Sequence, residues 1–230
     1  MHQSFPKSIT FDAVSILNRY FIELAFNGSK YHGWQKQDNA ISVQEVLNDA
    51  LNILLKQPVE TLGCGRTDTG VHATQLYVHF DLQAPVTDET RFLKSLNSLL
   101  PYDIAVKRLI QVEPRAHARF DAVKRSYQYH IHFEKDPFKH GLSWLLRDIP
   151  DMDLMNAAAA RIMQYTDFSC FSKSNTQTFT NNCVIYKAEW ERTASGLIFH
   201  ISADRFLRNM VRAIVGTLVS IGRREIDLED

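Results

Sequence analysis

The stretch RSYQYHIHF, residues 125–133, decides the fold because it opens a second copy of the pattern with which the chain begins. Apolar and polar residues alternate along it, which is typical of a β-strand with one buried face. Its apolar positions are Tyr127, Tyr129, Ile131 and Phe133. Further elements are expected in the order helix, strand, strand, helix, at 153–165 (capped by Asp153), 183–191, 196–203 and 206–222. The second half therefore has the order β-α-β-β-α.

The first half shows the same order with one more strand. Ser42 begins the capping box SVQE, which predicts the start of the first helix. A second helix is expected at 88–100, before Pro101. Strands are expected at 20–28, 59–63, 75–82 and 104–112. The resulting order is β-α-β-β-α-β, and two such units form a pair of ferredoxin-like, RRM-like halves.

We therefore predict an α+β fold whose two halves join into one extended, mostly antiparallel sheet with a central cleft. The first half is expected at 19–113 and the second at 114–230, after an N-terminal extension of residues 1–18. The pattern lacks the closing strand of the second half, so a C-terminal truncation is expected. Open sheet faces suit RNA, although a fold alone does not assign function.

Composition favours a cytoplasmic protein without a membrane anchor. The chain has 230 residues, of which 45% are hydrophobic, and this is enough to bury a core. No run approaches the roughly 18 apolar residues of a membrane span, and the N-terminus lacks the pattern of a signal peptide. The cysteines at 64, 170 and 183 are widely spaced, which fits reduced thiols rather than disulfides.

The formal net charge is zero, but basic residues are concentrated in two segments. Residues 205–224 contain five Arg and no acidic residue, and residues 105–130 contain six Lys or Arg against two acidic residues. Two such segments in a neutral protein indicate an anionic partner. Two solvated basic faces are the alternative, and charge alone does not exclude them.

Histidines offer a metal site as a further possibility. His130 and His132 share a strand face, and His200 lies elsewhere, but no acidic or cysteine ligand has suitable spacing. We therefore expect no metal. The chain also lacks a P-loop, a G-x-S-x-G elbow and a Rossmann fingerprint.

The stretch GCGRTDTG, residues 63–70, combines three Gly with an Arg and an Asp just before an expected strand. Taken alone, it is a polar turn in which glycine permits positive φ and Asp68 bonds to the backbone. Whether Asp68 does more depends on the other motifs of the chain.

Five motifs together resemble the tRNA pseudouridine synthase A family, from about residue 19 to the last residue. They are YHGWQKQ (31–37), GRTDTGVHA (65–73), AHARFDA (116–122), RSYQYHI (125–131) and FLRNMVRAIVGTL (206–218). The resemblance implies the pseudouridine synthase fold and an isomerase that converts uridine to pseudouridine at nucleotides 38, 39 and 40 of the tRNA anticodon stem-loop. It also implies a homodimer that needs neither metal nor cofactor.

The resemblance makes Asp68 the catalytic aspartate. The glycosidic C1′–N1 bond must break, the uracil must rotate, and C5 must bond to C1′. An ionised carboxylate can attack C1′, attack C6, or remove a ribose proton, and the sequence leaves all three open. The unperturbed pKa of an aspartate, about 3.9, keeps the group ionised at neutral pH.

Two substrate-binding residues are also implied by the resemblance. Arg208 matches a basic residue that pairs with the aspartate, and Tyr127 matches an aromatic residue that stacks on the target uracil. We expect an ion pair between Asp68 and Arg208 at roughly 2.7–2.9 Å, with a lowered pKa of Asp68. Without the resemblance, Arg208 is a surface arginine and Tyr127 a core residue.

The remaining implied residues contact RNA. Arg66 matches an arginine that helps to turn the nucleotide out of the stem, where a planar cation can fill the vacated space. Two segments combine polar, basic or aromatic groups suited to phosphates and unstacked bases. They are Ala116, His117, Ala118, Arg119 and Phe120, and Asn175, Thr176, Gln177, Thr178 and Phe179.

A different class of function is a non-catalytic RNA-binding module or tRNA chaperone with the same fold. A pure binder has no need of an unneutralised carboxylate in a cleft that binds phosphates. The presence of Asp68 together with Arg66, Tyr127 and Arg208 therefore favours the enzyme.

Overall fold

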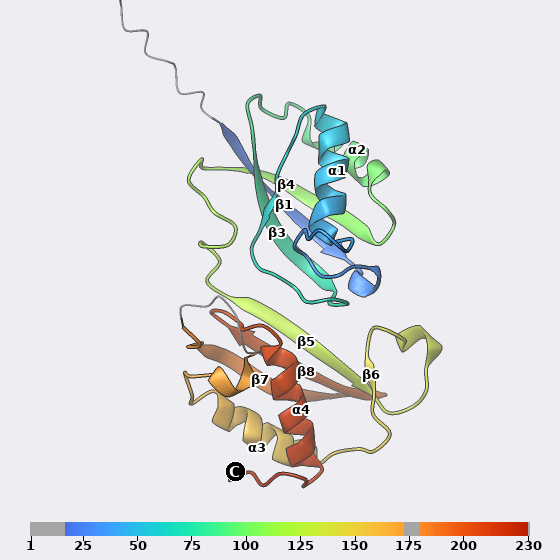
Figure 1. Cartoon of the computed structure of the whole chain (residues 1–230). Helices are drawn as coiled ribbons and strands as arrows, with labels where there is room; N and C mark the ends of the chain where they lie inside the picture. Colours follow the sequence, from blue (N-terminus) through green and yellow to red (C-terminus); the bar gives the residue numbers. More distant parts are fainter. Residues whose placement is uncertain (1–16, 173–179, 230) are drawn as a thin grey trace, which may run out of the picture.

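The computed structural model describes residues 17–172 and 180–229 (Figure 1). Its first half is a four-stranded antiparallel sheet with two helices on one side. The elements are β1 (Asn18–Phe26), α1 (Val43–Leu55), β2 (Leu62–Gly63), β3 (Ala73–Leu82), α2 (Glu89–Leu99) and β4 (Ile104–Val112). The strand order across the sheet is β2-β3-β1-β4. The predicted β-α-β-β-α-β order is therefore confirmed.

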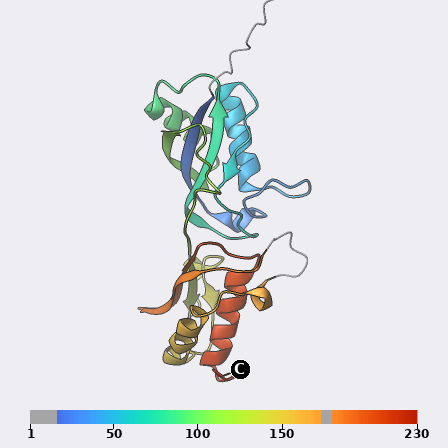
Figure 2. The same ribbon diagram turned by 90° about the vertical axis from the view of Figure 1, so that its left-hand side faces the viewer.

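The second half is another four-stranded sheet, also covered on one side by two helices (Figures 1 and 2). Its elements are β5 (Arg125–His132), β6 (Trp144–Leu145), α3 (Met152–Ile162), β7 (Ile185–Thr193), β8 (Gly196–Ala203) and α4 (Met210–Gly222). Short 3-10 helices η1 (Gly28–Lys30), η2 (Pro137–Lys139) and η3 (Ser169–Phe171) lie in the connections. The strand order is β6-β5-β8-β7.

The α+β class with two similar halves is confirmed, and the structure adds one strand. In the first sheet β4 pairs with β1 from Arg19 to Phe26. In the second sheet the corresponding place beside β5 is held by the short β6, which pairs in parallel with Ile131 and His132 alone. The described strands form two separate sheets rather than one continuous sheet. The halves are joined instead by loop contacts, which are described with the site.

Each core lies between a sheet and its helices. On β1, β3 and β4 the residues that face α1 and α2 are buried, and they form one cluster that includes Ile22, Leu24 and Val78. A second cluster, which includes Phe199 and Ile214, lies between β5, β7, β8 and the helices α3 and α4. In the first half, the sheet face away from the helices carries Arg19, Phe21 and Glu23 of β1, as strand alternation requires.

Side-chain caps fix where most helices begin. Ser42 Oγ accepts a hydrogen bond from Glu45 N at 3.2 Å, which confirms the predicted start of α1. The cap of α3 is Asp151, whose carboxylate accepts from the backbone of Asp153 and Leu154. The expectation that Asp153 caps this helix was therefore wrong by two residues.

The last helix begins four residues later than predicted. The expected helix 206–222 is α4, which spans Met210–Gly222. Asn209 has a positive φ of 66°, a left-handed conformation that cannot continue a right-handed helix. Residues 206–209 therefore form a separate segment before the helix. None of the described helices is long and apolar enough to cross a membrane.

The loop after β1 packs directly on the backbone of the loop before β3. Gly33 has a φ of +89°, and a Cβ atom built on it would lie 2.3 Å from Thr67 O. A Cβ on Gly28 would lie 2.0 Å from Val71 O. Only glycine permits so close an approach of two backbones. The two loops therefore hold each other in place.

This contact predicts opposite effects for two glycine-to-alanine changes. Gly33→Ala lowers the free energy of unfolding by more than about 1 kcal/mol, because the new Cβ meets Thr67 O and the φ is unfavourable. Gly216→Ala, on the exposed side of α4 with no atom near its Cβ position, raises it by about 1 kcal/mol. Urea unfolding of both variants measures the difference. Equal stability of the two would show that the loop contact is unimportant.

Candidate active site

Asp68 lies half-buried in the loop between β2 and β3. This loop is fixed by backbone hydrogen bonds on both sides of the aspartate. Trp34 N donates to Thr67 O at 3.3 Å, and Gly70 N donates to Tyr31 O at 3.2 Å. The loop that carries YHGW thus supports the loop that carries the carboxylate. The Asp68 carboxylate makes no hydrogen bond or ion pair with any described residue.

The second half brings an aromatic ring close to this carboxylate. Tyr127 lies half-buried on β5, and its ring packs edge-on against Phe206, with ring centroids 5.1 Å apart. Burial raises the pKa of Tyr127, and the negative charge of Asp68 raises it further. Asp68 and Tyr127, from different halves, therefore lie close enough to interact. Tyr127 also packs at the edge of the second core, as its reading as a core residue expects.

The expected ion pair between Asp68 and Arg208 is not formed. Arg208 is exposed and bonds to no other described residue. The left-handed Asn209 places Arg208 before α4 and off its helical path. Arg212, the third residue of α4, reaches the loop instead, and its Nη2 donates to Thr69 O at 2.9 Å. The predicted ion pair was wrong because the last helix was expected to begin at residue 206, whereas α4 begins at Met210.

His72 forms a second bridge between the halves at the same loop. Its Nδ1 accepts a hydrogen bond from Gly28 N at 3.0 Å, so the proton of the neutral ring lies on Nε2. Nε2 lies 3.0 Å from the carbonyl oxygen of Gly141, in the connection between β5 and β6. The motif GRTDTGVHA includes His72, but its pattern gave no sign of this contact. Arg66 of the same motif is exposed.

The segment 116–120 packs on the open face of the first sheet. Ala118 N donates to Nδ1 of the buried His79 at 3.2 Å, and Arg19 donates to Ala116 O at 2.9 Å. Burial lowers the pKa of His79, which keeps Nδ1 free to accept. His117 stacks on Phe120, with ring centroids 4.2 Å apart.

This packing leaves two groups free for a partner. Phe120 is 77% exposed although its ring lies on His117, and Arg119 is exposed beside it. An aromatic face and a guanidinium at adjacent positions suit a base and a phosphate. The other predicted RNA-contacting segment, Asn175, Thr176, Gln177, Thr178 and Phe179, lies outside the described residues.

Two of the three histidines considered for a metal site have other partners. His132 Nδ1 lies 2.9 Å from Ser143 Oγ, and His200 Nε2 lies 2.9 Å from Glu191. In the described part of the chain, no group of three or more His, Cys, Asp or Glu side chains is placed to hold a metal ion.

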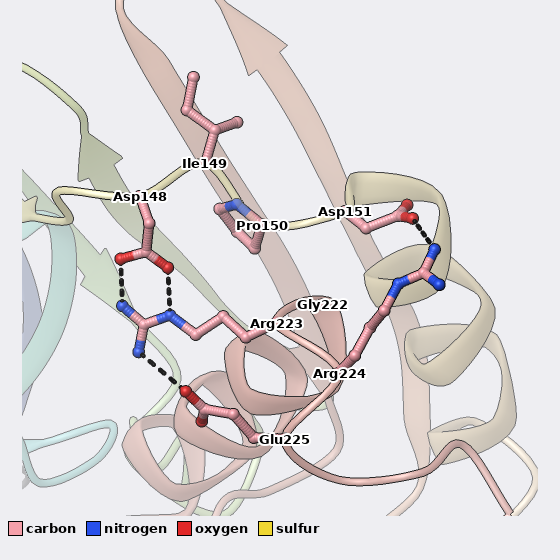
Figure 3. Close-up of a pocket in the computed structure, with 8 residues that line it drawn as sticks. All are labelled: Asp148, Ile149, Pro150, Asp151, Gly222, Arg223, Arg224 and Glu225. Atoms are coloured by element: carbon pink, nitrogen blue, oxygen red, sulfur yellow. Dashed lines mark hydrogen bonds and ion pairs between the residues drawn. The ribbon is translucent and has the colours of Figure 1, made fainter.

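A polar hollow lies at the C-terminal end of α4 (Figure 3). Arg223 donates two hydrogen bonds to Asp148, at 2.5 and 2.6 Å, and Arg224 pairs with Asp151 at 3.3 Å. Arg212 lies near the other end of this helix, about 15 Å along its axis. These ion pairs fix the residues at the C-terminal end of α4. Because the arginines and aspartates of the hollow are paired with one another, they are not available for chemistry.

The junction of the halves therefore combines the features that a reaction site needs. Asp68 supplies an unpaired carboxylate on a loop held from both sides. Tyr127 supplies a ring beside it, and Arg212 supplies a positive charge at the next residue of the loop. Such a carboxylate can act as a nucleophile or a base on a planar ring bound against Tyr127.

Comparison with known proteins agrees with this arrangement. Residues 164–230 match the family model described as tRNA pseudouridine synthase. The chain is 47% identical over 213 residues to a tRNA pseudouridine synthase A of Parabacteroides distasonis, covering 93% of this chain and 84% of that protein. It is 46% identical over 215 residues to one of Bacteroides fragilis, covering 93% of this chain and 85% of that protein. The chain belongs to the tRNA pseudouridine synthase A family.

Proposed function

We propose that this protein isomerises uridine to pseudouridine in tRNA, at nucleotides 38, 39 and 40 of the anticodon stem-loop. The observation that carries the proposal is the Asp68 carboxylate, which is half-buried beside Tyr127 and has no bonding partner among the described residues. A half-buried carboxylate that no described residue pairs with contributes no structural contact, so its place beside Tyr127 favours a chemical role. The homodimer implied by the family resemblance and the cytoplasmic location favoured by composition belong to the same proposal.

The reaction needs the carboxylate in its ionised form. Asp68 attacks C1′ or C6 of the uridine, or removes a ribose proton, and each path breaks the C1′–N1 bond. The detached uracil then rotates so that C5 bonds to C1′, the bond between Asp68 and the atom it attacked breaks (or the ribose proton returns from Asp68), and C5 finally loses its proton. The uracil must stay within the site during the rotation, and stacking on Tyr127 provides a surface on which a planar ring can turn.

Arg212, rather than Arg208, is the arginine that acts beside Asp68, although it binds the loop backbone and not the carboxylate. Its guanidinium holds Thr69 O and so fixes the residue that follows Asp68. The positive charge of Arg212 also lies close to Asp68, where it favours negative charge. Arg66 lies exposed on the same loop, where it can enter the space left by an extruded nucleotide.

RNA binding is assigned to the surface around the junction. Arg119 contacts a phosphate and Phe120 stacks on an unpaired base, because both are exposed on a segment fixed to the first sheet.

The direct test is incubation of the purified protein with unmodified tRNA, followed by carbodiimide-stop sequencing. Stops at nucleotides 38, 39 or 40 support the proposal. Tight tRNA binding without any pseudouridine would favour the alternative function, a non-catalytic RNA-binding module or chaperone. Pseudouridine at other positions alone would overturn the assignment of the target nucleotides.

The first variant to test is Asp68→Asn. Asparagine has the shape of aspartate without its negative charge, so turnover is abolished while tRNA binding remains. Pseudouridine formation and tRNA affinity are measured on the same preparation. Any pseudouridine made by the pure variant would exclude Asp68 as the reactive group.

Arg212 and Arg208 form a matched pair, since both are exposed arginines near the start of α4. Arg212→Ala releases the loop of Asp68 and lowers the rate constant of the bound complex by about 10²-fold, the usual cost of misplacing a reacting group by about 1 Å. Arg208→Ala leaves this rate constant close to that of the unmodified protein. The reverse order of effects would restore the sequence-based assignment.

Arg119 is tested through the salt dependence of binding. Each phosphate contact adds roughly 0.7 to 0.9 to the slope of log affinity against log salt concentration. Arg119→Ala therefore reduces the magnitude of that slope by about one unit and weakens the binding of different tRNAs alike. An unchanged slope would place Arg119 away from the RNA backbone.

A further inference from the structure

Arg125 binds four backbone carbonyl groups at the junction of the two halves. Its Nη1 donates to Ala122 O at 2.6 Å and to Asp204 O at 2.8 Å. Its Nη2 donates to Cys64 O at 2.9 Å and to Arg119 O at 2.8 Å. All four Nη hydrogens of the guanidinium are therefore used, each by a different residue.

The four carbonyl groups belong to segments that each carry part of the site. Cys64 begins the loop that leads to Asp68, and Asp204 begins the segment that leads to Phe206. Arg119 and Ala122 lie in the connection between β4 and β5, next to the exposed Phe120. One side chain thus joins the first half, the second half and the connection between them.

Arg125 also has a fixed relation to Tyr127. The two residues are two positions apart on β5, so their side chains leave the same face of the strand. The ring of Tyr127 has Phe206 against it and the charge of Asp68 nearby. Arg125 holds the loop in front of Asp68 and the segment in front of Phe206, and so sets the positions of both neighbours of the ring.

The contacts of Arg125 differ from those of an ordinary structural arginine. Among the described residues, Arg125 has no carboxylate partner, whereas Arg19 and Arg223 each bond to one. A lysine at this position has three donors on one nitrogen and cannot reach carbonyl groups on both sides of a planar fork. The arrangement therefore requires the guanidinium shape, and not the positive charge alone.

We propose that Arg125 is a positioning residue that sets Asp68 and Phe206 against Tyr127 for the isomerisation. This inference rests on the proposed function, because it concerns the rate of that reaction. It predicts that loss of the guanidinium lowers the rate of the bound complex without a matching loss of tRNA affinity. A residue that only binds RNA would change affinity, and one that only stabilises the fold would change neither once the protein is folded.

The test compares Arg125→Lys with the control Arg223→Lys under single-turnover conditions with saturating protein. The control loses a two-bond contact to Asp148 outside the site. Arg125→Lys lowers the rate constant by about 10²-fold, while its Kd for tRNA and its thermal midpoint match those of the control. Equal rates for both variants, or a loss confined to Kd, would overturn the proposal.

Further measurements separate the possible failures. If the unmodified protein forms no pseudouridine, the proposed function fails. If it does and Arg125→Lys is equally active, this inference alone fails. Hydrogen exchange without tRNA gives a readout independent of activity, and faster exchange is expected at 64–70 and 204–207 in Arg125→Lys only. Arg125→Gln is the second variant, and failure of both variants to fold would overturn the proposal by making Arg125 a stability residue.

Discussion

The site depends on one close approach between two stretches of backbone. Gly33 brings its loop so near to Thr67 O that no side chain fits between them. In the same loop, Tyr31 O accepts a hydrogen bond from Gly70 N. Two loops that are separate in sequence therefore behave as one rigid unit, because neither can move without breaking hydrogen bonds or creating a clash. A carboxylate on such a unit is held in place before any substrate binds, and this is what preorganisation requires.

The elements of the fold follow from local patterns, so they could be predicted from the sequence. The strand at 104–112 and the strand at 196–203 match β4 and β8, because alternation alone reports a half-buried strand. Ser42 marks the start of α1 through its own hydrogen bond. The two-residue β6 was missed, because a pair of residues carries no periodicity. The start of α4 was also missed, because Asn209 adopts its positive φ within a run that is otherwise compatible with a helix.

The contacts between the halves could not be predicted from spacing. Asp68 and Tyr127 were identified individually through motifs, and their proximity emerges only when two sheets are set end to end. Arg212 belonged to the same arginine-rich stretch as Arg208, and a shift of one helical turn decided which of them meets the loop. Arg125 stands in a quoted motif, but nothing in the sequence indicated its contacts, since its acceptors are backbone carbonyls, which every residue has.

The choice of carbonyl acceptors has a chemical consequence for Asp68. A direct ion pair with an arginine would hold the carboxylate ionised, but it would also occupy the oxygens that must meet the substrate. In this structure Arg212 and Arg125 donate to carbonyl groups near the aspartate instead. They supply positive charge and a fixed frame, and they leave both carboxylate oxygens without a partner among the described residues. The arrangement therefore holds Asp68 in position and leaves its carboxylate free, which the proposed attack on a bound uridine requires.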